Sequence, residues 1–265
     1  MSGLERIAEA FASARADGRR AALMPYLMGG FPDLDASRRI ALAYAENGAD
    51  LIELGIPFSD PLADGPVIHA AGTAALRAGV RTEDVLELAR SVAPAVPVIV
   101  MCYANPIFRR GLERFADTLV DAGACGLIVP DLPLEETEAA LAACDERGLA
   151  LVPLVAPTTP DERLARIGAS ARGFVYTVTL TGTTGERAAL DGQGLAGVVA
   201  RVASHTDVPV AVGFGIGTPE QAREAVDAGA QGVIIGSRLV RAAGQPDDPV
   251  GEVAGLVRGF AAALG

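Results

Sequence analysis

Short apolar runs alternate with amphipathic stretches along almost the whole chain, and this alternation constrains the fold more than any other feature. Eight runs rich in Val, Ile and Leu occupy residues 22–28, 51–54, 98–101, 126–129, 149–155, 173–178, 208–212 and 232–235. Apolar residues at helical spacing fill stretches between and after them, over 35–47, 82–93, 112–122, 134–146, 161–167, 195–204, 219–228 and 251–264. Such a pattern is typical of parallel sheets built from βα units.

Eight βα units in a chain of 265 residues match the size of a (β/α)8 TIM barrel, an α/β fold. We predict that residues 1–265 form a single barrel domain, with an extra N-terminal helix over the amphipathic segment 1–11. Gly-Ala pairs beginning at Gly48, Gly123 and Gly229 favour helix ends just before three of the strands. A doubly wound open sheet is the alternative fold, but no GxGxxG motif follows the first run.

Charge and composition exclude several classes of function. The net charge is -11 and no basic run occurs, which argues against nucleic acid or an anionic membrane as partner. All 22 basic side chains are Arg. Schiff-base aldol chemistry and covalently bound pyridoxal phosphate both need a lysine amine, so both are excluded for this chain. No signal peptide and no apolar run near 18 residues is recognisable, and we expect a cytoplasmic protein.

The residues that commonly bind metals are few and scattered. Cys102, Cys125 and Cys144 lack CxxC spacing, and the only histidines are His69 and His205. The sequence therefore predicts no metal site, and it predicts that the cysteines are small buried apolar residues of a reduced protein.

Two acidic residues have the pattern expected of an acid/base pair. Glu53 lies inside the second apolar run, and Asp60 and Asp64 follow in a Pro- and Gly-rich segment. Burial in a strand raises the pKa of a carboxyl group towards the value that a general acid or base needs. We interpret Glu53 and Asp64 as that pair. The alternatives are that Glu53 belongs to a buried ion pair and that Asp60 or Asp64 only forms a turn.

Glycine-rich segments follow the last three runs. They are Thr181-Gly182-Thr183-Thr184-Gly185, the segment 213–217 and Gly236-Ser237. Backbone N–H groups at such positions bind anions, and barrels often bind phosphate there, so we predict a phosphate monoester substrate. Apolar and aromatic residues at the other strand ends suit a flat aromatic group. For Met101, Ile128 and Asp131, taken singly, core packing or a helix cap is the favoured alternative.

Taken in order, these segments resemble one known family. They comprise ELGIPFSDPLADGPVI at 53–68, Tyr103-Ala104-Asn105-Pro106, Pro130-Asp131-Leu132-Pro133, the Thr-Gly-Thr-Thr-Gly segment, Gly-Phe-Gly-Ile at 213–216 and Gly236-Ser237. Over essentially its whole length the chain resembles the alpha subunit of tryptophan synthase. The resemblance implies a (β/α)8 barrel that cleaves indole-3-glycerol phosphate to indole and glyceraldehyde 3-phosphate by a retro-aldol step, without a metal or an organic cofactor.

The resemblance also implies roles for individual residues. Glu53 matches the glutamate that moves protons, Asp64 the aspartate that accepts the indole N–H, and Tyr176 a tyrosine that assists catalysis. The phosphate ligands match Gly185, Gly215, Gly236 and Ser237. The walls of the indole and propanol pocket match Tyr26, Ile68, Met101, Ile128 and Phe214. Thr184 matches a threonine of the mobile loop after the sixth strand, which orients the aspartate. Thr183, Met28 and His69 depart from the family pattern without removing a catalytic group.

The implied partner is a beta subunit, a pyridoxal phosphate enzyme that turns indole into L-tryptophan within an alpha2-beta2 heterotetramer. The docking positions of the family match Pro57, Asp60, Asn105, Phe108 and Pro133. One alternative is a stand-alone indole-3-glycerol phosphate lyase that releases free indole. Two others are a barrel isomerase acting on a similar phosphate and a non-catalytic barrel that only activates a beta subunit.

Overall fold

The strands form one parallel sheet in this computed structural model, which describes residues 1–178, 192–213 and 215–265. They are β1 Ala22–Met28, β2 Ile52–Gly55, β3 Val98–Met101, β4 Gly126–Ile128, β5 Ala150–Leu151, β6 Leu154–Val155, β7 Val175–Val178, β8 Val210–Gly213 and β9 Gly232–Ile235. Their order across the sheet is β5-β4-β3-β2-β1-β9-β8-β7-β6. The two ends of this order, β5 and β6, are consecutive in the chain.

The segment that contains β5 and β6 closes the sheet into a barrel. Residues 150–151 pair with β4, whereas residues 154–155 pair with β7. Between them, the Val152 N–H donates to the Leu127 carbonyl, and the Tyr176 N–H donates to the Pro153 carbonyl. The sequence predicts one strand over 149–155, and the structure divides it into two, because Pro153 has no N–H to donate. With this pair counted as one unit, the (β/α)8 TIM barrel is confirmed.

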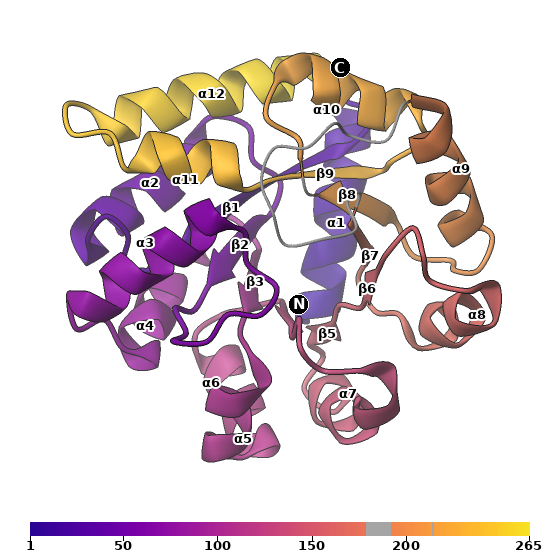
Figure 1. Cartoon of the computed structure of the whole chain (residues 1–265), viewed down its shortest axis with the longest axis horizontal. Helices are drawn as coiled ribbons and strands as arrows, with labels where there is room; N and C mark the ends of the chain where they lie inside the picture. Colours follow the sequence, from indigo (N-terminus) through magenta and orange to yellow (C-terminus); the bar gives the residue numbers. More distant parts are fainter. Residues whose placement is uncertain (179–191, 214) are drawn as a thin grey trace.

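Helices surround the barrel, as Figure 1 shows. Around the sheet lie α2 Leu34–Glu46, α3 Pro66–Arg77, α4 Thr82–Val92, α5 Ala104–Arg110, α6 Leu112–Asp121, α7 Glu138–Asp145, α8 Asp161–Ser170, α9 Gly192–Ala203, α10 Pro219–Asp227, α11 Ser237–Ala243 and α12 Pro249–Ala263. Helices α3, α5 and α11 add to those predicted. The stretch predicted as one helix over 134–146 consists of a 3-10 turn, η1 Leu134–Glu136, followed by α7.

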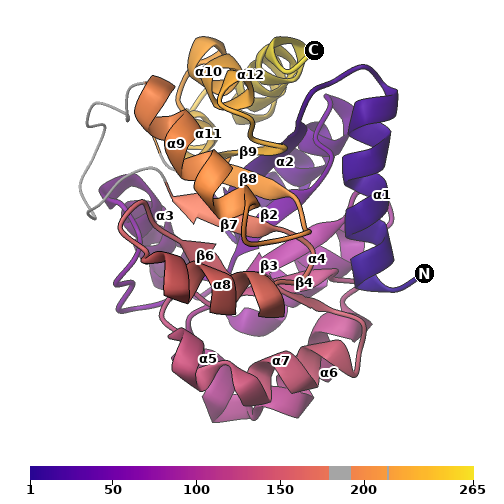
Figure 2. The ribbon, with the colours of Figure 1, turned by 90° about the vertical axis from the view of Figure 1, so that its right-hand side faces the viewer.

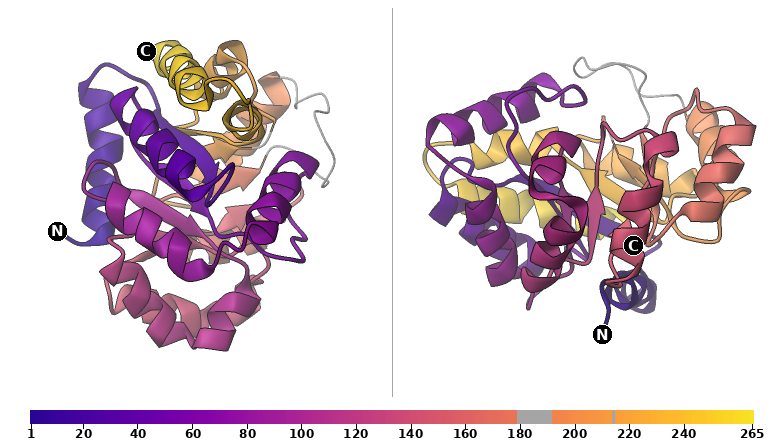
Figure 3. Two further views of the ribbon diagram at one scale, coloured as in Figure 1. Left: turned by 90° about the vertical axis from the view of Figure 1, so that its left-hand side faces the viewer. Right: turned by 90° about the horizontal axis from the view of Figure 1, so that it is seen from below.

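The predicted N-terminal helix is present as α1, Gly3–Ala16, which covers one end of the barrel. Figures 2 and 3 show it outside the ring formed by the other helices. Its residues Ile7, Phe11 and Ala14 pack with side chains from inside the barrel, and the rings of Phe11 and Phe174 lie 6.0 Å apart. Because Phe174 immediately precedes β7, α1 closes the end where the strands begin and leaves the opposite end accessible.

Two of the three apolar clusters among the described residues explain which way most strand residues face. A large cluster fills the space between the sheet and the helices, and a smaller one fills the inside of the barrel. Side chains alternate between them along a strand, as the pleat requires. Gly48, Gly123 and Gly229 all have positive φ just after helices, which confirms the predicted helix ends. No described helix combines the length and apolar character needed to cross a membrane.

Candidate active site

Glu53 points into the barrel from the middle of β2. Its neighbours Ile52 and Leu54 belong to the outer cluster, so the alternation along the strand directs the Glu53 side chain inward. It is 4% exposed, and its Oε2 has no hydrogen-bond partner among the described residues. Burial, followed by the charge of Asp64, raises the pKa of Glu53 to about 8. The group is therefore a carboxylic acid at neutral pH, able to donate a proton.

Asp64 approaches the same space from the loop between β2 and α3. The Tyr103 hydroxyl donates to its Oδ1 at 3.0 Å. Burial raises the pKa of Asp64, whereas the Tyr103 hydrogen bond and the nearby His69 side chain oppose that rise. Among the described residues Glu53 has no such opposing contact, so the two carboxyl groups differ in what favours their ionised forms.

A pocket of about 280 Å³ brings the predicted residues together at the ends of the strands. Those that line it are Tyr26, Glu53, Asp64, Ile68, Met101, Ile128, Tyr176, Gly215, Gly236 and Ser237. Gly185, Thr184 and Phe214 lie outside the described residues. Asp60 is exposed and does not line this pocket, and its carboxylate accepts a hydrogen bond from the neighbouring Ser59 hydroxyl, as a turn residue would.

Two tyrosines, Tyr26 on β1 and Tyr176 on β7, are accommodated by glycines on adjacent strands. The Tyr26 hydroxyl occupies the place where a Cβ on Gly55 would lie, and the Tyr176 hydroxyl has the same relation to Gly213. Burial and the neighbouring Glu53 and Asp64 charges raise the pKa of Tyr176 well above its usual value. Tyr176 is therefore a neutral phenol in this pocket, with a hydroxyl that can donate a hydrogen bond.

The glycine-rich strand ends differ in what their backbone groups already bind. The Gly217 and Thr218 N–H groups both donate to the Gln221 side-chain oxygen, which belongs to the capping box of α10. Gly215 and the Gly236-Ser237 pair line the pocket at the ends of β8 and β9. Arg238 and Arg241 also line the pocket there, and the sequence did not lead us to predict them. They follow Gly236-Ser237 and lie three residues apart, which places both on one face of the short helix α11.

The residues predicted to meet a partner follow the carboxyl ends of the strands. Asp60, Asn105, Phe108 and Pro133 are exposed, and Phe108 is 53% exposed, which is high for a large apolar side chain. Pro57 is buried in this chain. Asp131 accepts the backbone N–H of Ala104 at the start of α5, which confirms the helix-cap alternative for that residue.

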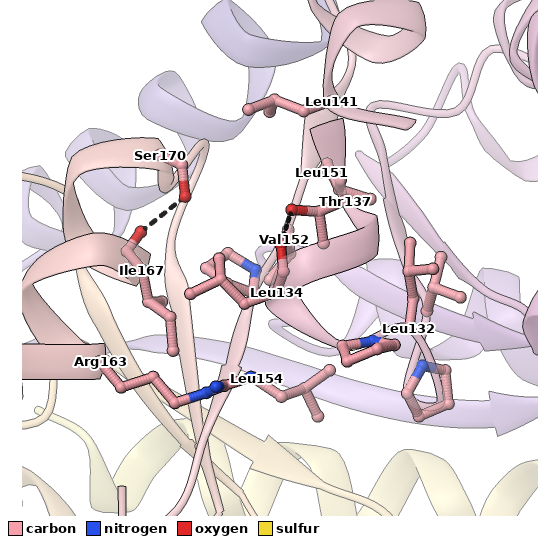
Figure 4. A pocket seen from close by; sticks show the side chains of 14 residues that line it. Leu132, Leu134, Thr137, Leu141, Leu151, Val152, Leu154, Arg163, Ile167 and Ser170 are labelled. Carbon is pink, nitrogen blue, oxygen red and sulfur yellow. Dashed lines mark hydrogen bonds between the residues drawn. The ribbon is translucent and has the colours of Figure 1, made fainter. Parts of the chain in front are cut away.

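A second cavity, of about 160 Å³, lies next to the first and shares Pro130 and Leu154 with it. Figure 4 shows that leucines and Ile167 dominate its walls. The Thr137 and Ser170 hydroxyls donate to nearby carbonyls, and Arg163 pairs with Glu135. No carboxyl group is found among the described residues that line this cavity, so of the two it is the larger one that contains the acidic pair.

None of the three cysteines lines either cavity. Cys102, Cys125 and Cys144 are buried and unbridged, as predicted, and burial raises the pKa of Cys102 and of Cys144 to about 12. Within residues 1–178, 192–213 and 215–265, no three His, Cys, Asp or Glu side chains are grouped closely enough to hold a metal ion.

A barrel with a buried protonated glutamate and a loop aspartate in one pocket is the arrangement of an enzyme that works by acid/base chemistry. The family model described as tryptophan synthase alpha chain matches residues 11–257. This chain belongs to the tryptophan synthase alpha chain family, which places it among the lyase subunits of tryptophan biosynthesis.

Individual relatives and solved structures agree with that assignment. The chain is 49% identical to the tryptophan synthase alpha chain of Synechococcus elongatus over 236 residues, 88% of each sequence. It is 48% identical to that of Roseiflexus castenholzii over 260 residues, 96% of this chain and 98% of the relative. A structure of Mycobacterium tuberculosis tryptophan synthase is similar to it with a TM-score of 0.90 and 41% identity, covering 98% of both chains.

Proposed function

We propose that this chain cleaves indole-3-glycerol phosphate to indole and glyceraldehyde 3-phosphate, and that it passes the indole to a beta subunit that makes L-tryptophan. The observation that carries the proposal is that the buried Glu53 carboxyl group faces the same pocket as Asp64. Its Oε2 has no hydrogen-bond partner among the described residues. A retro-aldol cleavage of this substrate needs a proton donor and a carboxylate at two different places on one indole ring.

Glu53 supplies and recovers the proton. Its carboxylic acid protonates indole C3, which turns the ring into an electron sink with a positive nitrogen. The resulting Glu53 carboxylate takes the proton of the side-chain hydroxyl, and the carbon–carbon bond breaks as the aldehyde forms. The bond electrons return to the ring and neutralise the nitrogen, so indole leaves with its N–H intact and Glu53 is a carboxylic acid again.

Asp64 stabilises the intermediate between these steps. Its carboxylate accepts the indole N–H, and this contact strengthens when the nitrogen becomes positive, which is where stabilisation lowers the barrier. The Tyr103 hydrogen bond favours the ionised form that this role requires. The buried Tyr176 phenol assists beside Glu53 as a hydrogen-bond donor.

The ends of β8 and β9 hold the phosphate, and the apolar walls hold the indole. Gly215, Gly236 and Ser237 offer backbone and hydroxyl donors, and Arg238 and Arg241 add positive charge to that side of the pocket. The walls that receive the flat ring consist of Tyr26, Ile68, Met101 and Ile128. The resemblance to the family assigns Gly185 to the phosphate site, Thr184 to the loop after the sixth strand and Phe214 to the pocket. All three lie outside the described residues.

The composition of the chain and the exposure of its surface residues support the roles that we propose for this chain and for the beta subunit. The chain has no lysine, so the pyridoxal phosphate of tryptophan synthesis belongs to the beta subunit. The exposed Asp60, Asn105, Phe108 and Pro133 form the docking face, and Pro57, which matches a further docking position, is buried in this chain. We propose an alpha2-beta2 heterotetramer in which docking and site closure favour the same state, so that each strengthens the other.

The test measures the formation of glyceraldehyde 3-phosphate from indole-3-glycerol phosphate by the wild type and by Glu53→Gln, with and without a beta subunit. We expect slow cleavage by the isolated chain, strong stimulation by the beta subunit, and loss of both in Glu53→Gln. Fast cleavage that the beta subunit leaves unchanged would identify a stand-alone lyase. No cleavage by the wild type in either condition would refute the proposed reaction.

A further inference from the structure

The Tyr103 hydroxyl makes two contacts with the loop that carries Asp64. It accepts the Ala63 backbone N–H at 3.0 Å and donates to Asp64 Oδ1, also at 3.0 Å. The loop between β2 and α3 has no regular secondary structure over residues 56–65. One phenol therefore fixes both the backbone before Asp64 and the carboxylate itself, at a place where the chain has no strand or helix to do so.

Burial, a hydrogen bond at the next residue and ring stacking hold Tyr103 in place. It is 3% exposed and forms the N-cap of α5, just after β3. Asp131 accepts the Ala104 N–H at 2.8 Å, which anchors the residue next to it. The Tyr103 ring stacks on Phe58, with ring centres 5.2 Å apart and planes 24° from parallel. A side chain fixed in this way orients its hydroxyl with little remaining freedom.

Tyr103 is not among the residues that line the pocket, whereas Ala63 and Asp64, which its hydroxyl contacts, both line it. Tyr103 therefore acts on the reacting atoms through the loop that carries Asp64. We propose that Tyr103 is a positioning residue for the reaction: its hydroxyl holds Asp64 towards the indole N–H and keeps that carboxylate ionised. This inference rests on the proposed function for its catalytic consequence. The contact between Tyr103 and Asp64 does not depend on the proposed function, so the experiment can test the contact and the function separately.

Several other groups act on Asp64, and the experiment must leave them unchanged. The titratable and charged groups that act on Asp64 or share its pocket are Tyr26 on β1, Glu53 on β2, His69 on α3, Tyr176 on β7, and Arg238 and Arg241 on α11. Tyr103→Phe removes only one hydroxyl and keeps the ring that stacks on Phe58. It therefore removes the hydrogen bond to Asp64 and the one from the Ala63 N–H, and it changes none of these other groups.

We expect Tyr103→Phe to lower kcat for cleavage about 10- to 100-fold, the range expected when a hydrogen bond to a charged group is lost, with KM changed less than about threefold. The pKa of Asp64, followed by the carboxyl carbon resonance in a pH titration of the ligand-free protein, should rise. The acid limb of the kcat/KM profile, which reports the free enzyme, should move to higher pH in step with it. A purely structural role would lower stability without moving either titration.

Tyr44→Phe is the matched control. Its hydroxyl is also buried and donates to a backbone carbonyl, that of Tyr26, with no carboxyl partner. It should leave the Asp64 titration unchanged. An unchanged Asp64 pKa or an unchanged kcat in folded Tyr103→Phe would overturn the proposal, and so would an equal effect of Tyr44→Phe.

A second variant covers the case in which Tyr103→Phe fails to fold. Phe58→Leu keeps the Tyr103 hydroxyl and removes the stacked ring, so the Asp64 pKa should rise less and kcat should fall less. If it alters neither, the proposal is also overturned. If the wild type cleaves no indole-3-glycerol phosphate, the proposed function fails, whereas the Asp64 titrations still decide whether Tyr103 controls this carboxylate.

Discussion

A Cβ on Gly213 of β8 would lie 2.5 Å from the hydroxyl oxygen of Tyr176 on β7. Because Gly213 has no side chain, Tyr176 has room for its ring in the pocket. Register explains the contact, because Tyr176 pairs with Ala211 and Gly213 lies two residues further along the same face. Tyr176 is 6% exposed and its neighbours are packed, so it cannot move aside freely.

We therefore expect Gly213→Ala to displace Tyr176 and lower the cleavage rate by up to about 100-fold, since misplacement near 1 Å can cost that much. Gly197→Ala on α9 is the control, because a Cβ there meets no atom within 4 Å. That change should keep full activity and stabilise the helix by about 0.5–1 kcal/mol. Steady-state kinetics and circular dichroism measure both variants, and normal kinetics in Gly213→Ala would contradict the argument.

The buried acid at Glu53 makes the stability of the protein depend on pH. Its pKa of about 8 in the folded state lies above the ordinary value of 4.5 that applies after unfolding. Between these values the native state keeps a proton that the unfolded state releases, so the free energy of unfolding falls as pH rises, by at most about 1.4 kcal/mol per pH unit. Below pH 4.5 both states are protonated and this contribution is flat.

Glu53→Gln removes this titration, so its stability relative to the wild type should increase from pH 5 to pH 8 and then level off. Urea unfolding at several pH values measures the difference. The exposed Glu162→Gln on α8 is the control and should run parallel to the wild type. A difference between Glu53→Gln and the wild type that stays constant across this range would show that Glu53 does not carry a raised pKa.

The same ionisation should appear in the kinetics. Cleavage needs Glu53 as a carboxylic acid, so kcat/KM should fall above about pH 8 as the proton is lost. The profile reports the free enzyme and is best measured under single-turnover conditions with the beta subunit saturating. An activity that rises steadily from pH 7 to pH 9 would mean that the carboxylate of Glu53, and not its acid form, starts the reaction.

Much of this arrangement follows from periodicity alone. The strands over 22–28, 98–101 and 232–235 have the predicted bounds, because each is a continuous apolar run. The inward direction of Glu53 follows from its place between two outward-facing residues. Local rules also explain part of what was missed, since Gly65-Pro66 is a helix start with proline in the first turn and Pro153 breaks a strand.

The contacts that refine the site are harder to find in a sequence. Tyr103 and Asp64 are 39 residues apart and meet only because β2 and β3 are neighbours with a fixed register. The stacking of Phe58 on Tyr103 joins one loop to the start of a helix. No periodicity encodes such pairs, because they depend on the path of irregular backbone after the strands end.

A buried hydroxyl on β7 offers a way to stabilise the protein. Thr177 is fully buried, and no hydrogen-bond partner for its Oγ1 occurs among the residues that the structure describes. Val has nearly the same shape without the polar atom, so Thr177→Val should raise stability by about 1 kcal/mol, or the melting temperature by roughly 2–4 °C. Thr118→Val is the control, because the Thr118 hydroxyl donates to the Arg114 carbonyl, and it should give no gain. Equal melting temperatures for the wild type and Thr177→Val would show that the hydroxyl is satisfied.

Phe108 should supply part of the affinity for the beta subunit. It is 53% exposed on α5, the helix that also carries Asn105, at the end of the barrel where the pocket opens. Fully burying a phenylalanine side chain is worth about 1.5–3 kcal/mol, and Phe108 has about half of its surface left for a partner to cover. Phe108→Ser should therefore weaken binding about tenfold, measured by calorimetric titration with the beta subunit. The control is Val120→Ser, which removes another exposed apolar side chain, 46% exposed on α6, beside the loops that precede the strands. Because the proposed docking face lies at the opposite end, Val120→Ser should bind like the wild type, and an equal loss in both variants would place the partner elsewhere.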